Sequence, residues 1–182
     1  MLVLAPGPSG AVGINLDSGA FVRATFPPAT ALVPFDVAVG PAHDAEPEEL
    51  NPPEALPMRS APRRVGRLPR RRAERYLRPL LHPRSGPLLG FNGPAIRYWA
   101  LAHDRPSVAL VEPQTVPQVV RTAGGLRCHF GWRGRLESLP FTTSRPRLPS
   151  RRLLGKARVL VLLGPPQEGY CYKLVAGVLP KP

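Results

Sequence analysis

The chain has 182 residues, of which 26 are Pro and 17 are Gly, and its formal net charge at pH 7 is +13. Because proline interrupts the interior hydrogen bonds of helices, this composition excludes a long-helix bundle or a coiled coil. The length suits one domain, or one domain with an appendage, and it suffices for a real hydrophobic core.

Charge divides the chain into an acidic and a basic part. Residues 1–58 hold one basic and seven acidic residues, whereas residues 59–182 hold 24 basic and five acidic residues. Most of the basic residues are Arg. A bias in codon usage explains Arg in place of Lys, but it does not explain the excess of positive charge. The excess therefore favours an anionic partner, since the planar guanidinium pairs with phosphate through two hydrogen bonds.

Residues 1–40 contain short apolar runs bounded by Pro and Gly, which predict strands at Leu2–Ala5, Ala20–Phe26 and Ala31–Val39. We expect these strands to join the sheet system of the rest of the chain, because so short a segment cannot bury a core alone. Prolines and acidic residues then dominate residues 41–69. Their low apolar content cannot offset the entropy of ordering, which predicts an acidic, Pro-rich linker or a long exposed loop.

Residues 70–81 have the clearest helical pattern in the chain. Pro79 predicts a kink or an end near Arg78. The apolar residues recur at i, i+3, i+4, i+7 and i+8 and form one stripe, made up of Ala73, Tyr76, Leu77, Leu80 and Leu81. The arginines of this segment lie off the stripe, where they face solvent or a partner.

From Gly86 onward the pattern indicates hairpins. Strands are predicted in pairs: Ala95–Ala102 with Ser107–Val111, Leu126–Trp132 with Arg135–Leu139 around Arg133-Gly134, and Ala157–Leu163 with Tyr170–Val178. The last pair includes an apolar run that predicts a central strand. Residues 70–182 are thus expected to form an Arg-rich helix and an antiparallel β-domain. The predicted fold is mainly β, α+β at most: a small antiparallel barrel or sandwich of hairpins with one principal amphipathic helix.

The segment Gly7-Pro8-Ser9-Gly10 resembles the opening of the phosphate loop in guanylate-kinase-type P-loop proteins. That loop needs a Lys for the phosphates and a Ser or Thr for magnesium, and neither follows here. The segment is therefore interpreted as a tight turn.

The cysteines and aromatic residues are assigned to the core. Cys128 and His129 are neighbours on a predicted strand and point to opposite faces, so they cannot share one metal ion. Cys128 lies on the face of Phe130 and Trp132, and Trp99 and Trp132 are both expected to be core residues, although stacking of bases on exposed aromatic rings is the alternative. No metal, no cofactor and no catalytic residues are predicted, because the chain lacks paired ligands and a nucleophile–base signature.

The N-terminus lacks the basic region and the apolar run of a signal peptide, and no stretch approaches the length needed to span a bilayer. This pattern predicts a cytoplasmic protein with reduced thiols and no membrane partner.

The arginine clusters are the strongest functional signal. They indicate a protein that binds nucleic acid, or another polyanion, through phosphate groups. The alternatives are a protein-interaction or assembly module, in which the helix stripe binds a partner or a second copy, and a basic surface neutralised by the acidic run 44–54. The predicted nucleic-acid contacts are Arg63, Arg64, Arg67, Arg70, Arg71, Arg72, Arg75, Arg78, Arg151, Arg152 and Lys156.

Overall fold

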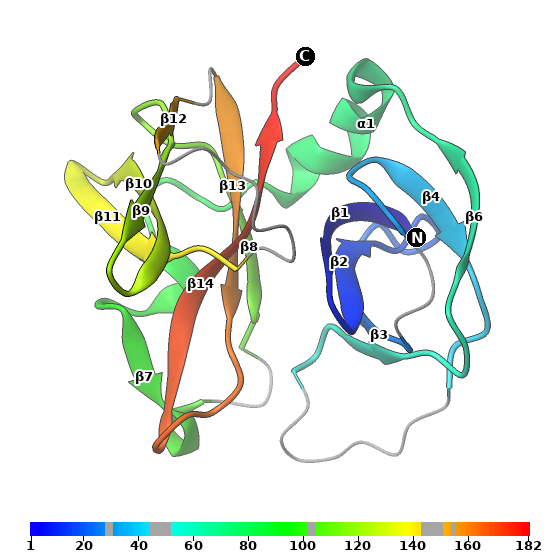
Figure 1. The fold of residues 1–182 in the computed structure, drawn as a ribbon, viewed down its shortest axis with the longest axis horizontal. Coiled ribbons are helices and arrows are strands. Elements are labelled where there is room, and N and C mark those ends of the chain that lie inside the picture. Colours follow the sequence, from blue (N-terminus) through cyan, green and yellow to red (C-terminus); the bar gives the residue numbers. More distant parts are fainter. Residues whose placement is uncertain (28–30, 44–51, 102–104, 143–150, 154–155) are drawn as a thin grey trace. The chain divides into compact units, whose positions relative to one another are not determined.

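The computed structural model describes residues 1–27, 31–43, 52–101, 105–142, 151–153 and 156–182, with the backbone only at 151–153. The chain divides into two compact units, Met1–Leu80 and Leu81–Lys181 (Figure 1). Strands account for 50% of the structure and helices for 11%, and one sheet curls into a half-barrel. The predicted mainly β fold with one principal helix is confirmed.

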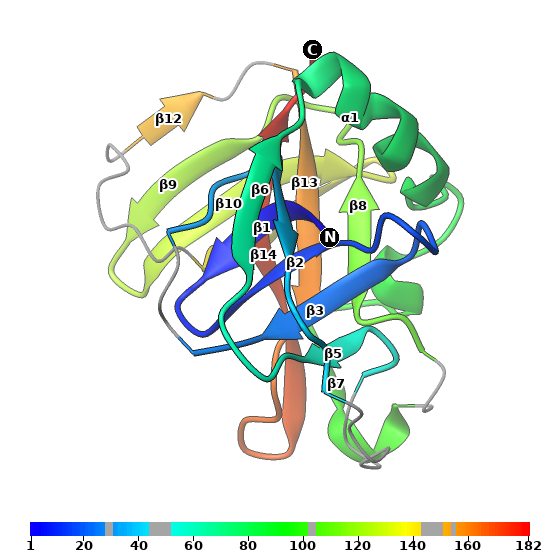
Figure 2. The same cartoon turned by 90° about the vertical axis from the view of Figure 1, so that its right-hand side faces the viewer.

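The first unit is built on a sheet whose described strands have the order β5-β3-β2-β1-β4-β6 (Figure 2). These strands are β1 (Leu2–Gly7), β2 (Gly10–Ile14), β3 (Phe21–Thr25), β4 (Asp36–Val39), β5 (Ala55–Pro57) and β6 (Arg63–Arg67). Neighbouring strands are antiparallel apart from the parallel pair β3–β5. One face of the sheet buries a core that includes Val3, Ala24, Phe26, Leu32 and Ala38.

Helix α1 (Arg70–Leu77) follows β6 and continues as the short 3-10 turn η1 (Arg78–Leu80). The α-helix thus ends just before Arg78, as Pro79 predicts. Of the predicted stripe, Ala73 and Leu77 are buried and the other members are half-buried, so the stripe is the sheltered side of this helical segment.

Two expectations for the first unit differ from the structure. The N-terminal strands form their own sheet instead of joining that of residues 70–182, and β5 and β6 lie inside residues 41–69, where a linker or loop is expected. One physical reason accounts for both: β5 and β6 extend the N-terminal sheet at its two ends, and this larger sheet buries a core of its own. β5 and β6 satisfy backbone groups of β3 and β4, and the prolines stand at or beyond strand ends, as Pro57 and Pro62 do, where no ladder hydrogen bond is lost. Residues 44–51 lie outside the described residues.

Strand β2 is absent from the sequence-based prediction because it is rich in small residues. The turn before it is confirmed: Gly7 pairs with Gly10, and β1 and β2 form a hairpin around Pro8 and Ser9. A side chain at Gly10 would collide with the carbonyl oxygen of Ala24 on the next strand. Close strand packing therefore requires the glycine that weakens the sequence signal for this strand.

The second unit contains two antiparallel sheets, which within the described residues have the orders β11-β10-β9-β12 and β7-β14-β13-β8. The strands are β7 (Ala95–Arg97), β8 (Val108–Val111), β9 (Gln118–Thr122), β10 (Gly125–Trp132), β11 (Arg135–Pro140), β12 (Arg151–Leu153), β13 (Ala157–Leu163) and β14 (Tyr170–Pro180). Short 3-10 turns η2 (Leu88–Gly90) and η3 (Tyr98–Ala100) lie outside the sheets. Both sheets contribute to one core, which includes Phe130 and Leu139 from one sheet and Val161 and Val175 from the other.

The hairpin predictions in this unit are confirmed in two cases of three. β10 and β11 pair around Arg133 and Gly134, whose φ angles of 52° and 71° are those of a type I′ turn, and β13 pairs with both β14 and β8 as a central strand. The third hairpin is wrong: β7 pairs with β14 and β8 with β13. After β7 the Tyr98 amide bonds the carbonyl oxygen of Gly169, and the chain turns into η3 (Tyr98–Ala100) in place of a longer strand. Residues 102–104 lie outside the described residues.

Candidate nucleic-acid interface

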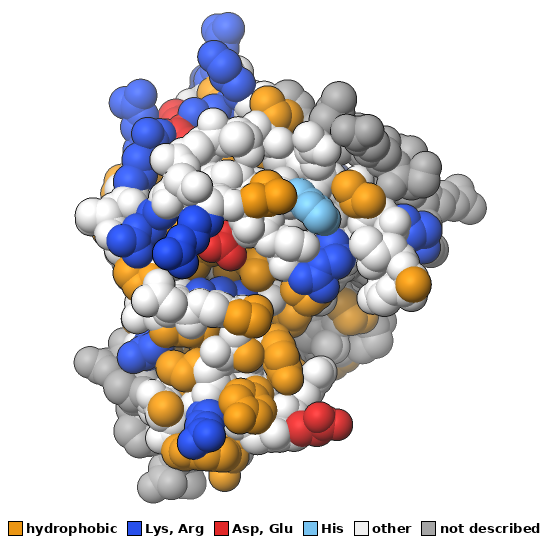
Figure 3. Space-filling view, turned by 90° about the vertical axis from the view of Figure 1, so that its left-hand side faces the viewer, with side chains coloured by type: hydrophobic (Ala, Val, Ile, Leu, Met, Phe, Trp, Pro, Cys, Tyr) orange, Lys and Arg blue, Asp and Glu red, His pale blue; other side chains and the backbone are white. Residues whose placement is uncertain are grey.

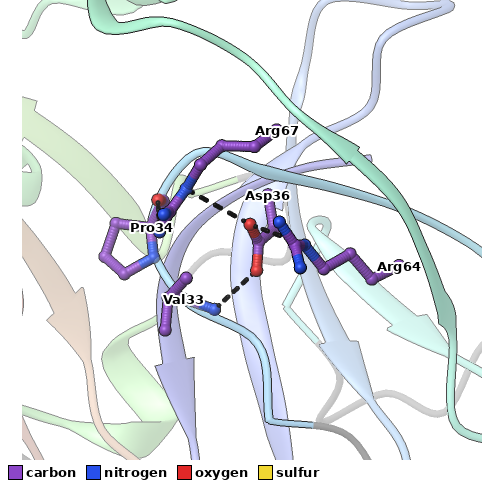
Figure 4. A network of polar contacts seen from close by, with 5 residues as sticks. All are labelled: Val33, Pro34, Asp36, Arg64 and Arg67. Carbon is purple, nitrogen blue, oxygen red and sulfur yellow. Dashed lines mark hydrogen bonds and ion pairs between the residues drawn. The ribbon is translucent and has the colours of Figure 1, made fainter.

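A bulge in β6 places two of the predicted arginines on one side of the strand. In β4, Asp36 and Ala38 share a face because they are two positions apart, and their partners in β6 are Arg67 and Arg64. The pairing skips Val65, which is the extra residue of the bulge. Arg64 and Arg67 therefore both reach the carboxylate of Asp36 (Figure 4).

Asp36 is the buried centre of this cluster and is only 1% exposed. Its Oδ2 accepts a hydrogen bond from the backbone N–H of Val33 at 3.0 Å. Its Oδ1 lies 3.1 Å from Nε of Arg64 and 3.4 Å from Nε of Arg67, but neither N–H is directed well enough to form a hydrogen bond. The two contacts are thus mainly electrostatic, and both guanidinium groups stay about half exposed.

The loop before β4 is shaped to present Asp36. Phe35 has a φ of 72°, a left-handed conformation that costs about 1 kcal/mol or more for a residue other than glycine. Its amide bonds the carbonyl oxygen of Val3, and its own carbonyl accepts the amide of Leu68, just beyond β6. Phe35 itself is buried, which helps to offset the strain.

Helix α1 carries the densest group of exposed arginines in the first unit. Arg70, Arg71 and Arg72 occupy its first turn, where the helix dipole is positive and cations are unfavourable. Arg75 lies over the ring of Tyr76 at 4.7 Å, and Arg78 reaches Glu74 at 3.7 Å. The first-turn arginines therefore cost helix stability, and an anion bound beside them would reverse that cost.

The remaining predicted contacts belong to the second unit. Arg151 and Arg152 lie on β12, whose backbone pairs with Val120 and Val119 of β9. Lys156 is exposed just before β13. Of the predicted contacts, the first unit thus contains those on β6, α1 and η1, and the second unit contains those on β12 and at Lys156. The arginines between 143 and 150 lie outside the described residues.

Several aromatic side chains of the second unit are exposed, including one that the sequence assigns to the core. Trp132 is buried as expected, but Trp99 is 61% exposed, which corrects its assignment to the core. Tyr98 lies edge-on to Trp99 at 5.2 Å, and the guanidinium of Arg97 lies 5.5 Å from the Trp99 ring. Tyr170 and Tyr172, also exposed, begin β14 beside them, on the face opposite the buried Cys171.

We call this group the aromatic cluster; it consists of Arg97, Tyr98, Trp99, Tyr170 and Tyr172. The face in Figure 3 has hydrophobic side chains gathered in its lower half, with Lys and Arg side chains both among them and over the upper half. Tyr170 and Tyr172 flank Cys171 in a predicted strand, so assigning Cys171 to the core already implies that both tyrosines face away from it. The exposure of Trp99 follows from η3, which the sequence does not indicate.

The cysteines and the other potential metal ligands form no reactive or metal-binding group among the described residues. Cys128 and Cys171 are buried thiols in the core of the second unit. Burial raises the pKa of the Cys128 thiol to about 12, which keeps it protonated and unreactive at neutral pH. Among the described residues, no three His, Cys, Asp or Glu side chains are grouped so that they could hold a metal ion.

The part of the chain that the structure describes contains no helix with the length and apolar character needed to cross a bilayer. Comparisons of the chain with protein-family models, with curated proteins and with solved structures find no match.

Proposed function

We propose that this protein binds nucleic acid, mainly through the phosphate backbone. The observation that carries the proposal is the run of exposed arginines on β6 and α1, which are joined by only two residues, Leu68 and Pro69. Arg64 and Arg67 are held in place by Asp36, and Arg70, Arg71 and Arg72 stand at a helix start where they do not stabilise the fold. Phosphate contacts of this kind position a protein without reading bases, so little sequence specificity is expected.

The aromatic cluster supports a contribution from unpaired bases. Exposed aromatic rings stack on bases whatever their identity, and arginine beside a ring adds a contact to the phosphate or to the base face. Trp99 and the two exposed tyrosines of β14 offer such rings in the second unit. Single strands are therefore proposed to bind more tightly than duplexes of equal length.

The alternative function, assembly through the helix stripe, has weaker support. Ala73 and Leu77 are buried, at 0% and 3% exposure. Residues sheltered to this degree serve the packing of their own chain, and only the half-buried members of the stripe remain for a partner.

A salt titration tests the proposed function. Fluorescence anisotropy measures the binding of labelled duplex DNA, single-stranded DNA and RNA to the full chain across a series of salt concentrations. If about six phosphates are neutralised, the logarithm of the affinity falls with the logarithm of salt at a slope near −5 on duplex DNA. Absence of binding even at about 50 mM salt contradicts the proposal, because phosphate contacts are strongest under those conditions.

A further inference from the structure

The second unit contains a pocket of about 400 Å³, lined by residues of this unit alone. This volume is within the range of small-molecule sites. The loop after η2 provides Phe91, the tip of the β10–β11 hairpin provides Arg133, Arg135 and Glu137, and β14 provides Lys173. Trp132 completes the aromatic part of the wall.

Lys173 is unusual because its position in β14 belongs to the core side of the strand. Cys171 and Val175, two positions away on either side, are both core residues, and Lys173 itself is only 3% exposed. Its Nζ donates a hydrogen bond to the carbonyl oxygen of Phe91 at 2.7 Å and lies 4.0 Å from the centre of the Phe91 ring. A buried lysine with its ammonium at a pocket wall is costly for folding, which points to a role in binding.

The hairpin places its charges on the same side of the sheet as the core. Arg135 is opposite Trp132 in the β10–β11 ladder, and Glu137 is opposite Phe130. Since cross-strand partners share a face, both charged residues lie on the face that packs the core and line its open end. Arg133 lies in the turn between β10 and β11. The pocket thus combines three cations with one carboxylate.

We propose that this pocket binds the phosphate group of a small phosphate monoester. Arg133 and Arg135 supply guanidinium groups at the mouth, and Lys173 supplies an ammonium group at the wall. The formal charge of the lining is +2, which balances the charge of about −1.5 to −2 that a phosphate monoester carries near neutral pH. Phe91 and Trp132 offer ring surfaces for the organic part of the ligand.

The ionisation of Lys173 agrees with this geometry. Burial lowers the pKa of the Lys173 ammonium to about 8, while the charge of Glu137 opposes this change. A second anion beside Lys173 would stabilise the ammonium further. Without a ligand, a substantial fraction of Lys173 is the neutral amine at mildly alkaline pH, and a neutral amine can be trapped chemically.

Pyridoxal 5′-phosphate is a suitable probe, because it carries a phosphate and an aldehyde, and pyridoxal is the matched probe without the phosphate. The amine nitrogen attacks the aldehyde carbon, the carbonyl oxygen leaves as water, and borohydride then donates hydride to the carbon of the resulting imine. The chain has three lysines, Lys156, Lys173 and Lys181, so mass spectrometry of peptides assigns the adducts without ambiguity.

The proposal predicts that pyridoxal 5′-phosphate labels Lys173 at least about tenfold more efficiently than pyridoxal does. Arg133 and Arg135 hold its phosphate through one or two charge-assisted hydrogen bonds, which brings the aldehyde to the fraction of Lys173 that is the neutral amine. Lys156 is exposed and serves as the internal reference. Because pyridoxal closes to an internal hemiacetal and is less reactive towards any lysine, the preference of Lys173 is expressed relative to that of Lys156. Excess inorganic phosphate occupies the pocket and keeps Lys173 protonated, so it lowers labelling of Lys173 by both probes and leaves labelling of Lys156 unchanged.

The double variant Arg133→Ala/Arg135→Ala removes the preference of Lys173 for the phosphorylated probe while retaining labelling by pyridoxal. The control variant Arg84→Ala/Arg121→Ala makes the same change of charge elsewhere in the unit and retains the preference. Equal labelling of Lys173 by the two probes, labelling that follows Lys156, or a preference that survives in the Arg133/Arg135 variant would each overturn the proposal. Circular dichroism confirms that both variants are folded.

Discussion

Arg64 and Arg67 lie on the same side of strand β6, although they are three positions apart and a regular strand would send them to opposite faces. The bulge at Val65 makes this possible, and the buried carboxylate of Asp36 is the reason that the arrangement is stable. One acidic residue thus fixes two of the arginines that we propose as phosphate contacts, while leaving their guanidinium groups accessible.

Replacing Asp36 by Asn is expected to lower the free energy of unfolding of the first unit by about 1–3 kcal/mol, because the buried carboxylate loses the charge that attracts two half-exposed guanidinium groups. Urea denaturation measures the change. The control is Asp17→Asn, which removes an exposed carboxylate, and it is expected to change stability by less than about 0.5 kcal/mol. Equal effects of the two substitutions would show that the Asp36 cluster does not stabilise the unit.

Replacing Arg71 and Arg72 together by Ala is expected to flatten the salt dependence of duplex binding by up to about 2 in the log–log slope, since each lost phosphate contact contributes about 0.9. The helix itself is expected to become slightly more stable, because two cations leave its first turn. Anisotropy gives the slope and thermal denaturation gives the stability. The double variant Arg84→Ala/Arg121→Ala has the same charge but should keep the original slope; a similar slope change in both would mean that only net charge matters.

Replacing Trp99 by Ala is expected to weaken binding of single-stranded DNA by about 1–3 kcal/mol, the usual value of one stacked base, and to leave duplex binding nearly unchanged. Trp99 is the exposed one of the two tryptophans, so its fluorescence should be quenched by single strands. Leu136→Ala, which removes the most exposed large apolar side chain among the described residues, is the control. An equal loss for duplex and single strand would exclude stacking on Trp99.

The acid sensitivity of the second unit depends partly on Glu112. Hydrogen bonds from Lys181 and Arg84, together with the charges of Lys181 and Arg158, hold the pKa of the Glu112 carboxyl below its ordinary value of 4.5, although partial burial opposes this change. A carboxyl whose pKa is lower in the folded state stabilises the fold above the unfolded pKa and loses this effect as pH falls through the folded pKa. Glu112→Gln should therefore lower stability by up to about 1 kcal/mol at pH 7 and have no effect in strong acid, as measured by urea denaturation across pH.

The pH dependence of the second unit's stability at alkaline pH should reveal the lowered pKa of the Lys173 ammonium. Its pKa is about 8 in the folded state, against an ordinary value of 10.5, so the unfolded chain binds more protons between these two values. The free energy of unfolding should therefore rise with pH from about 8 to 10.5, relative to that of the Lys173→Met variant, in which this contribution is absent. Parallel pH profiles for the two proteins would contradict the burial of the ammonium.

The second unit shows best what the sequence reveals. The apolar run Val159–Leu163 indicates a strand buried on both faces, and Arg133-Gly134 indicates a tight hairpin because Gly134 can adopt a positive φ angle without strain. These signals are local, and the structure confirms them. The arginines on α1 are likewise exposed as predicted, since their position off the stripe depends on helical spacing alone.

Other features depend on contacts between distant segments. β6 is a strand because β4 lacks a partner on that side, and a residue such as Val65 in a Pro- and Arg-rich segment gives no sign of this. Lys173 lies in an otherwise ordinary alternating strand, and only the approach of the hairpin and of Phe91 gives it a pocket. Trp99 follows a strand that pairs with β14 and not with its neighbour in sequence, so its exposure is a property of topology.

The bulged strand β6 has one more consequence, which concerns aggregation. β6 lies at one end of the strand order in its sheet, and such a terminal strand is a template on which another chain can extend the sheet. The extra residue interrupts the regular ladder, and three arginines in five positions would bring like charges together if a second β6 approached. The opposite end, β5, is three residues long and contains Pro57. Both ends of the sheet therefore resist growth into a continuous intermolecular sheet, and the arginines proposed to bind phosphate also keep copies of this chain apart.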